Sequence, residues 1–286
     1  MNKDHMLRKS VEQEYKDKLE NSGGSCAHRF EQEFGYTNEE LEFIPAGAQN
    51  SSFGCANPLS LSSIKPGDTV LDLGSGAGMD VILAARKVGV KGKVIGVDMT
   101  GAMIDKARQN INEAGLGSVA EIRKGIIESL PVESNSVDWV ISNCVVSLSP
   151  DKEQVFAEVC RVLKPGGKML ITDLVTETLP YWLTSLARLK SPASAKALDR
   201  ETYLATIARS GLNAVSLQGE LVYDKAMIMS LLKDELNINS TLAQAISKGD
   251  GAQVLSHCLK PLLGAAARAT AEKVSSIKVY GEKPYN

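Results

Sequence analysis

Short apolar runs alternate with mixed apolar and polar segments between residues 69 and 175. Runs such as "TVLDLGS" have the continuous hydrophobic character of strands that are buried on both faces of a parallel sheet. The predicted strands are 69–75, 92–99, 120–126, 136–143 and 168–175, and the predicted helices are 79–89, 101–115 and 149–163. This alternation predicts an α/β fold, with a doubly wound, mostly parallel sheet and helices on both of its faces.

The flanking segments follow other patterns. Residues 1 to about 45 are polar and read as helical, and Thr37 and Glu40 have the spacing of a capping box at a helix start. After residue 175 we expect a helix that ends at Gly211, a short strand, a mainly helical stretch over 224–274 and a last strand near 275–284. We therefore predict an N-terminal helical arm (1–45), a central domain (46–175) and a smaller α+β C-terminal lobe (176–286).

Composition restricts the partners. The chain has 286 residues and a formal net charge of −2, so it lacks the basic field typical of nucleic-acid binding and a polybasic face for anionic membranes. No apolar run approaches the roughly 20 residues that cross a bilayer, and the charged start does not resemble a secretory signal. We expect a cytoplasmic protein that acts on a small molecule, without nucleic-acid or membrane partners.

The five cysteines do not form a recognisable framework. They are Cys26, Cys55, Cys144, Cys160 and Cys258, an odd number with wide spacings, so a disulfide framework is not expected in a reducing compartment. There is no CxxC pair, which leaves a structural zinc site without support. None of the three histidines lies in a core motif, so histidine base catalysis is not favoured either.

The segment "LDLGSGAGMD" (71–80) carries the clearest binding signal. Gly74, Gly76 and Gly78 fall between a predicted strand and a predicted helix, where glycines permit a tight turn and a close approach to a ligand. Asp98 ends the next strand, where a carboxylate can accept hydrogen bonds from ribose hydroxyls. The alternative for Asp98 is a structural one, as the N-cap of the following helix.

Two cofactor classes compete for this turn. Dinucleotide sites favour G-x-G-x-x-G, whereas this chain has G-x-G-x-G preceded by Asp72. That pattern favours S-adenosylmethionine over a nicotinamide cofactor. Ile127 follows the third strand and either packs on the adenine or is an ordinary core residue. The expected cofactor-binding residues are Asp72, Gly74, Ser75, Gly76, Gly78, Asp98, Met99, Ile127, Glu128 and Asn143.

Several segments together resemble the arsenite S-adenosylmethionine methyltransferases. They are "GYTNEELEFIPAGA", "FGCANP", "VLDLGSGAGMD", "GVDMTGAM", "KGIIESLP", "SVDWVISNCVVSLSPDK" and "RVLKPGGKMLITDL", and they cover about residues 34–175. "FGCANP" and "ISNCVVSLSPDK" are the specific ones, since class I methyltransferases in general share the glycine motif. The resemblance implies a Rossmann-like methyltransferase sheet with a smaller C-terminal lobe.

The same resemblance implies roles for three cysteines. Cys144 stands where the family binds trivalent arsenic, Cys55 stands in the corresponding upstream loop, and Cys26 stands where family members carry an N-terminal cysteine. Thiolates suit a soft centre such as trivalent arsenic, so Cys55, Cys144 and Cys26 are the expected catalytic residues.

One family feature is missing. A further arsenic-binding cysteine of the C-terminal lobe would fall at or beside Ala193 in "SPASAKAL" (191–198), a segment without cysteine. Cys258 could supply a thiol, although a buried apolar role suits it better, and Cys160 reads as structural. Asp173 ends the fifth strand and either faces the site or caps the following turn.

The leading hypothesis is a methyltransferase for arsenite or methylarsenite. The first alternative is a methyltransferase of the same fold with a different, organic small-molecule acceptor. The second is a protein that binds S-adenosylmethionine without transferring its methyl group.

Overall fold

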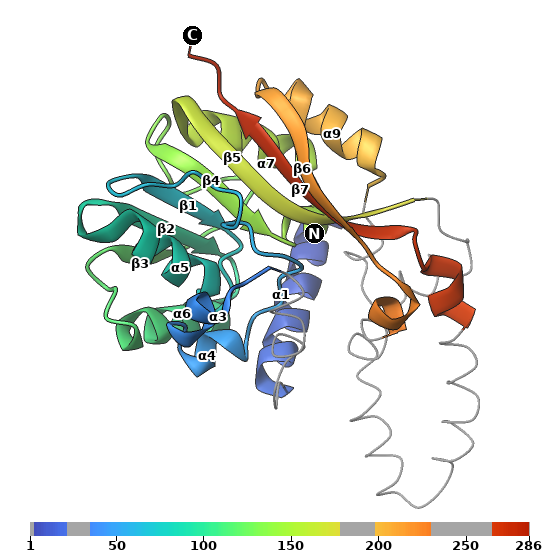
Figure 1. Ribbon diagram of the computed structural model, residues 1–286, viewed down its shortest axis with the longest axis horizontal. Helices are drawn as coiled ribbons and strands as arrows, with labels where there is room; N and C mark the ends of the chain where they lie inside the picture. The colour runs from blue at the N-terminus through green and yellow to red at the C-terminus, as the bar shows by residue number, and fades with distance from the viewer. Residues whose placement is uncertain (1–2, 22–34, 178–197, 230–264, 286) are drawn as a thin grey trace, which may run out of the picture.

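The computed structural model describes residues 3–21, 35–177, 198–229 and 265–285. Within these residues seven strands form one sheet, in the order β3-β2-β1-β4-β5-β7-β6 (Figure 1). The strands are β1 Thr69–Leu73, β2 Lys93–Asp98, β3 Ala120–Lys124, β4 Val137–Asn143, β5 Leu163–Thr176, β6 Asn213–Val222 and β7 Val274–Glu282. Strands β1 to β5 pair in parallel, and β7 runs antiparallel to both of its neighbours. The predicted mostly parallel, doubly wound sheet is confirmed.

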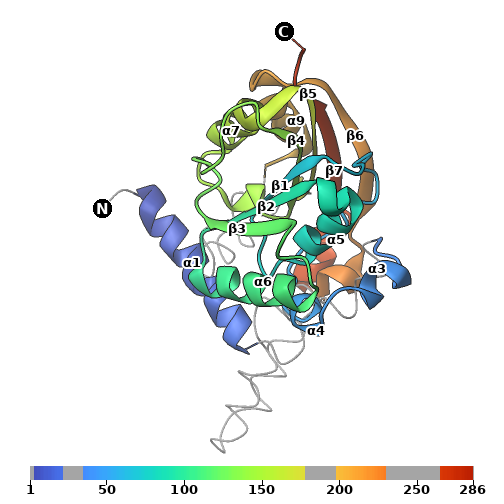
Figure 2. The same ribbon diagram turned by 90° about the vertical axis from the view of Figure 1, so that its left-hand side faces the viewer.

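Helices cover both faces of the sheet. Helices α5 (Met79–Val88) and α6 (Gly101–Glu113) lie on one face, and α7 (Lys152–Val162) and α9 (Arg200–Arg209) lie on the other (Figure 2). Each face has its own apolar core, with Ile82 of α5 in one and Phe156 of α7 in the other. Both side chains are fully buried, as expected for a parallel sheet enclosed by helices.

The fifth strand is longer than the sequence predicts. Residues 164–167, which separate the predicted helix 149–163 from the predicted strand 168–175, lie inside β5, because Leu163 pairs with Val137 while Lys168 already pairs with Trp139. Residues 164–167 therefore bulge from the strand at this register shift, and Gly166 takes a φ of +74°. The glycines and proline that suggest a turn thus form a bulge.

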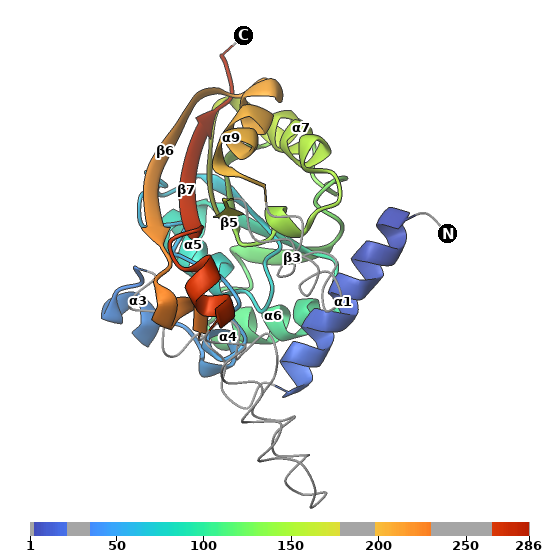
Figure 3. The same cartoon turned by 90° about the vertical axis from the view of Figure 1, so that its right-hand side faces the viewer.

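The N-terminal segments include three helices, α1 (Lys3–Asn21), α3 (Asn38–Glu42) and α4 (Ala46–Gln49). The predicted capping box is present, with reciprocal hydrogen bonds between Thr37 and Glu40 at the start of α3. Helix α1 lies across the end of the molecule near α6 (Figure 3). This position brings an N-terminal element close to the carboxyl ends of the strands.

The C-terminal part contributes to the same sheet through β6 and β7, and short helical segments at 225–229 and 265–270 lie beside it. The expected last strand is confirmed as β7. The limits proposed for the arm, the central domain and the C-terminal lobe stay a prediction. Among the described residues no helix has the length and apolar character needed to span a membrane.

Candidate functional site

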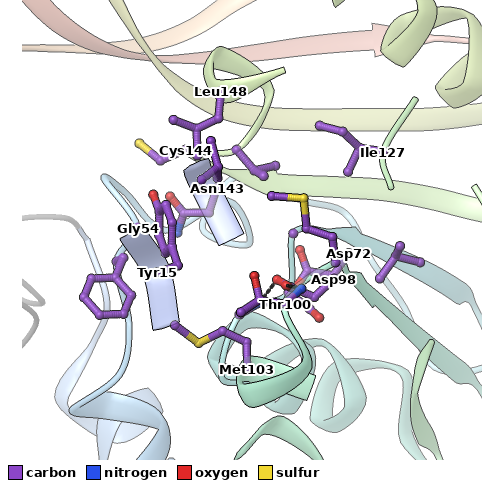
Figure 4. Close-up of a pocket in the computed structure, with 18 of the residues that line it drawn as sticks. Tyr15, Gly54, Asp72, Asp98, Thr100, Met103, Ile127, Asn143, Cys144 and Leu148 are labelled. Atoms are coloured by element: carbon purple, nitrogen blue, oxygen red, sulfur yellow. Dashed lines mark hydrogen bonds between the residues drawn. The ribbon is translucent and has the colours of Figure 1, made fainter. Parts of the chain in front are cut away.

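A pocket lies at the carboxyl ends of β1, β2 and β4 (Figure 4). The chain leaves β1 and β4 towards opposite faces of the sheet, and ligands of open α/β sheets bind at such a switch point. The pocket wall includes Asp72, Gly74, Ser75, Gly76, Asp98, Met99, Ile127, Glu128 and Asn143. The expected cofactor residues thus gather around one cavity, with the exception of Gly78.

The glycine turn needs its glycines for distinct reasons. Gly74 has a φ of +66°, and a Cβ there would lie 2.4 Å from Cγ2 of Val145. Gly76 has a φ of +51° and open space beside it, so its backbone is exposed to a ligand. Gly78 has a φ of +89° and is the N-cap of α5, which explains why it directs the chain instead of lining the pocket.

Asp98 connects two parts of the pocket. Its Oδ2 accepts a hydrogen bond from the Gly76 amide at 2.9 Å, and its Oδ1 accepts one from the Thr100 amide at 2.8 Å. The N-cap of α6 is Thr100, so Asp98 does not have the capping role that was its structural alternative. Its carboxylate instead fixes the glycine turn against the end of β2, at the edge of the pocket.

Three carboxylates, two of them buried, give this pocket its electrostatic character. Burial raises the pKa of Asp72 well above its ordinary value, and the charges of Asp80 and Asp98 raise it further. Burial also raises the pKa of Asp80 to about 6, although hydrogen bonds from Asn143 and Tyr36 favour its charged form. In their ionised form these carboxylates attract a cation and repel phosphate groups. Sequence reasoning missed Asp80, although it ends the quoted motif "LDLGSGAGMD".

The residues present fit S-adenosylmethionine better than a dinucleotide. The carboxylates suit its positive charge, and Asp98 lies where a ribose is expected. The Ser75 hydroxyl is buried in the pocket wall and has no partner within the described chain, so it is available to a ligand. A pyrophosphate beside Asp72 and Asp80 would meet like charge.

Two cysteines meet at the pocket wall. Cys55 and Cys144 are joined as a disulfide with a Cα–Cα distance of 5.9 Å, although 89 residues separate them in the chain. Cys144 lines the pocket, and Cys55 lies behind it, 4% exposed. No disulfide framework was expected, and this single disulfide departs from that prediction. The two loops converge at the end of β4, which the wide sequence spacing conceals.

Helix α1 supplies pocket residues that sequence reasoning did not single out. Arg8 pairs with Glu128 at 3.4 Å, and Val11 and Tyr15 also line the cavity. Leu7 and Val11 pack with Met99 and Leu148, so this helix covers the pocket. The spacing of Leu7, Val11 and Tyr15, four residues apart each time, is the signal that could have indicated this face.

Other candidates take structural places. Asp173 is fully buried and accepts hydrogen bonds from the Ser147 amide at 2.7 Å and the Tyr203 hydroxyl at 3.1 Å. It therefore secures the turn at Val146–Leu148, which follows β4, and it does not line the pocket. Neither the site-facing role nor the capping of the turn after the fifth strand describes this place. Cys160 is a free, partly buried cysteine on α7.

Some predictions cannot be followed in the structure. Cys26, Cys258 and residues 191–197 lie outside the described residues. Within the described ranges no group of three or more His, Cys, Asp or Glu side chains could hold a metal ion.

Comparison with known proteins agrees with this geometry. The methyltransferase domain family matches residues 64–236. An arsenite methyltransferase from Halobacterium salinarum is 47% identical over 163 residues, which cover 56% of this chain and 41% of the relative. One from Aquipseudomonas alcaligenes is 39% identical over 132 residues, covering 44% of this chain and 37% of the relative. The chain thus spans less than half the length of these relatives.

A solved structure shows the same likeness in three dimensions. It is the arsenic (III) S-adenosylmethionine methyltransferase from Chlamydomonas reinhardtii, with a TM-score of 0.62 and 28% identity. The superposition covers 86% of this chain and 72% of that one.

Proposed function

This chain belongs to the methyltransferase domain family, and we propose that it transfers the methyl group of S-adenosylmethionine to a trivalent arsenical held by the thiolates of Cys55 and Cys144. The family match confirms the predicted resemblance, the class of enzyme and the cofactor. The acceptor and the roles of individual residues are the subject of the proposal.

The charges and the glycine turn on one side of the pocket support a role in cofactor binding for that side. The carboxylates of Asp72 and Asp80 balance the positive charge of S-adenosylmethionine, and Asp98 and the Gly76 backbone hold the ribose side. When bound, S-adenosylmethionine supplies an electrophilic methyl group. Helix α1 excludes water from this half through Val11 and its neighbours, which strengthens the electrostatic interactions inside.

The acceptor half depends on the cysteine pair. Reduction of the disulfide would leave two thiols that already lie within bonding distance of each other. Two thiolates fixed in this way bind a soft, three-coordinate centre as a chelate and leave its lone pair available for the methyl carbon. The single observation that carries the proposal is this convergence of Cys55 and Cys144 on the wall of the cofactor pocket.

The test is formation of S-adenosylhomocysteine by the whole purified protein with S-adenosylmethionine, a thiol reductant and either arsenite or methylarsenite. We expect turnover that requires both the arsenical and the reductant. Cys55→Ser and Cys144→Ser should each abolish it while calorimetry still shows cofactor binding. Cys160→Ser is the matched control, because Cys160 is a free cysteine on α7 that does not line the pocket, and it should retain activity.

Two results would count against the proposal. Arsenical-dependent turnover that survives when Cys55→Ser and Cys144→Ser are combined would exclude the thiol site. Turnover only with an organic acceptor would establish the alternative methyltransferase.

A further inference from the structure

The side chain of Asn143 lies between the two cysteine-bearing segments. Its Oδ1 accepts hydrogen bonds from the Cys55 amide at 2.9 Å and the Ala56 amide at 3.3 Å, and its Nδ2 donates to the Ala56 carbonyl at 2.6 Å. Asn143 also directly precedes Cys144 in the chain. One amide group therefore connects the backbone of Cys55 to that of Cys144.

Further partners fix the orientation of this amide. Thr172 of β5 donates its hydroxyl to Oδ1 at 3.0 Å, and Nδ2 donates to Asp80 of α5 at 3.0 Å. The Tyr36 hydroxyl accepts from Nδ2 at 3.2 Å and donates to Asp80 at 2.8 Å. The amide is thus anchored to a strand and a helix of the sheet framework, and these elements in turn hold the loop.

The Cys55 loop also packs tightly against Asn143. A Cβ at Gly54 would lie 2.2 Å from Nδ2 of Asn143, so only glycine permits this approach of the backbone. The loop cannot shift towards β4, and the hydrogen bonds prevent it from moving away. In the reduced protein, where the disulfide no longer joins the two cysteines, this side chain is therefore the direct link between their backbones.

We propose that Asn143 is a positioning residue, which holds Cys55 within bonding distance of Cys144 and uses its amide for that purpose and not for direct cofactor contact. Fixing two thiols in this way raises their effective concentration towards each other, and towards any centre that both must bind. The consequence for turnover rests on the proposed function. The positioning itself does not require an arsenical.

Exchange with glutathione measures this positioning directly. In the exchange Cys55 and Cys144 lose two protons and two electrons as their disulfide forms, and one glutathione disulfide takes them up to give two glutathione thiols. The whole protein is equilibrated in glutathione buffers, and peptide mapping by mass spectrometry quantifies the Cys55–Cys144 disulfide. The equilibrium ratio gives the effective concentration of one thiol relative to the other.

The variants are Asn143→Ala and the matched control Asn57→Ala. Asn57 is a buried asparagine of the same loop, but its Nδ2 donates to the Gly35 carbonyl and to Glu40, both at 3.1 Å, away from the cysteines. We expect Asn143→Ala to lower the effective concentration by about tenfold, which corresponds to about 1.4 kcal/mol. Asn57→Ala should change it by less than about threefold, equivalent to about 0.7 kcal/mol.

An unchanged effective concentration in folded Asn143→Ala would overturn the proposal, and so would an equal fall in both variants. If Asn143→Ala does not fold, Thr172→Val decides, because it removes one anchor of the amide and leaves the amide in place. A fall in the same direction supports the proposal, and no change overturns it. Asn143→Ala could lower the effective concentration while the wild-type protein methylates no arsenical. That combination would support the positioning role and reject the proposed function.

Discussion

Protonation of Asp80 should oppose binding of the cationic cofactor. Asp80 lines the pocket, and burial raises its pKa to about 6. The titratable groups that act on it are Tyr36, Asp72 and Glu40, none of them cationic. A bound cation favours the charged carboxylate, so binding should release a proton and the affinity should rise with pH.

The size of the effect follows from that pKa. With a pKa of about 6, roughly one tenth of Asp80 is ionised near pH 5 and roughly nine tenths near pH 7. If only the ionised form binds well, the affinity for S-adenosylmethionine rises about tenfold over this interval, or about 1.4 kcal/mol. Asp80→Asn removes the charge, and it also relieves Asp72, whose pKa the Asp80 charge raises. We expect weaker binding near pH 7 and a smaller dependence on pH.

Isothermal titration calorimetry between about pH 5 and pH 8 measures both quantities, and buffers of different ionisation enthalpy count the protons released. Asp173→Asn is the matched control. The pKa of Asp173 is likewise raised to about 6 by burial, but Asp173 does not line the pocket. A wild-type affinity that is flat or falls as pH rises would refute the reasoning. If Asp80→Asn keeps the pH dependence of the wild-type affinity, a titratable group other than Asp80 causes that dependence.

Three further predictions concern the turn, α1 and the thiol site. Gly74→Ala should destabilise the fold by about 2–4 kcal/mol in thermal unfolding, because a strained φ and a collision with Val145 coincide. Gly115→Ala, with a φ of +70° and open space beside it, should lose only about 1–2 kcal/mol, and equal losses would exclude the collision. Val11→Asp should weaken cofactor binding at least about tenfold, since it places a charge in the apolar contact with Met99. Ser10 is exposed, so Ser10→Asp should not weaken it, and equal cofactor affinities of the two variants in calorimetry would contradict the prediction. Ser276→Ala should weaken arsenical binding about three- to tenfold, because the Ser276 hydroxyl donates to Sγ of Cys55 at 3.4 Å. Ser275→Ala is the control, since the Ser275 hydroxyl donates to Glu220, and equal affinities of the two variants would remove Ser276 from the site.

The cofactor half of the site could be predicted from local sequence. The strand β1, the turn through Gly74 and Gly76, and Asp98 at the end of β2 all follow from short patterns. Parallel strands bring their carboxyl ends to one edge, so residues that follow two adjacent strands are neighbours whatever the rest of the chain does. The N-cap interpretation of Asp98 was excluded only by the structure, since the same position suits both roles.

The thiol half could not be predicted in the same way. A family resemblance placed Cys55 and Cys144 in one site, but nothing local indicates that they touch, or that Asn143 connects them. Nor does any local pattern show that Ser276, from the last strand, reaches Cys55. These contacts join segments that are far apart in the chain, and they exist because β7 returns beside β5 and the Cys55 loop folds over the end of β4.

The sequence by itself therefore determined the alternation of strands and helices, the glycine turn and the carboxylate at the end of β2, because each depends on periodicity or on the conformation of a few adjacent residues. Only the tertiary structure decided which loops meet. It brought Asp80, Asn143 and Cys144 to one pocket, joined Cys55 to Cys144, and placed α1 across the pocket. The physical reason is that such contacts depend on strand order and on the packing of whole elements, which a short stretch of sequence does not encode.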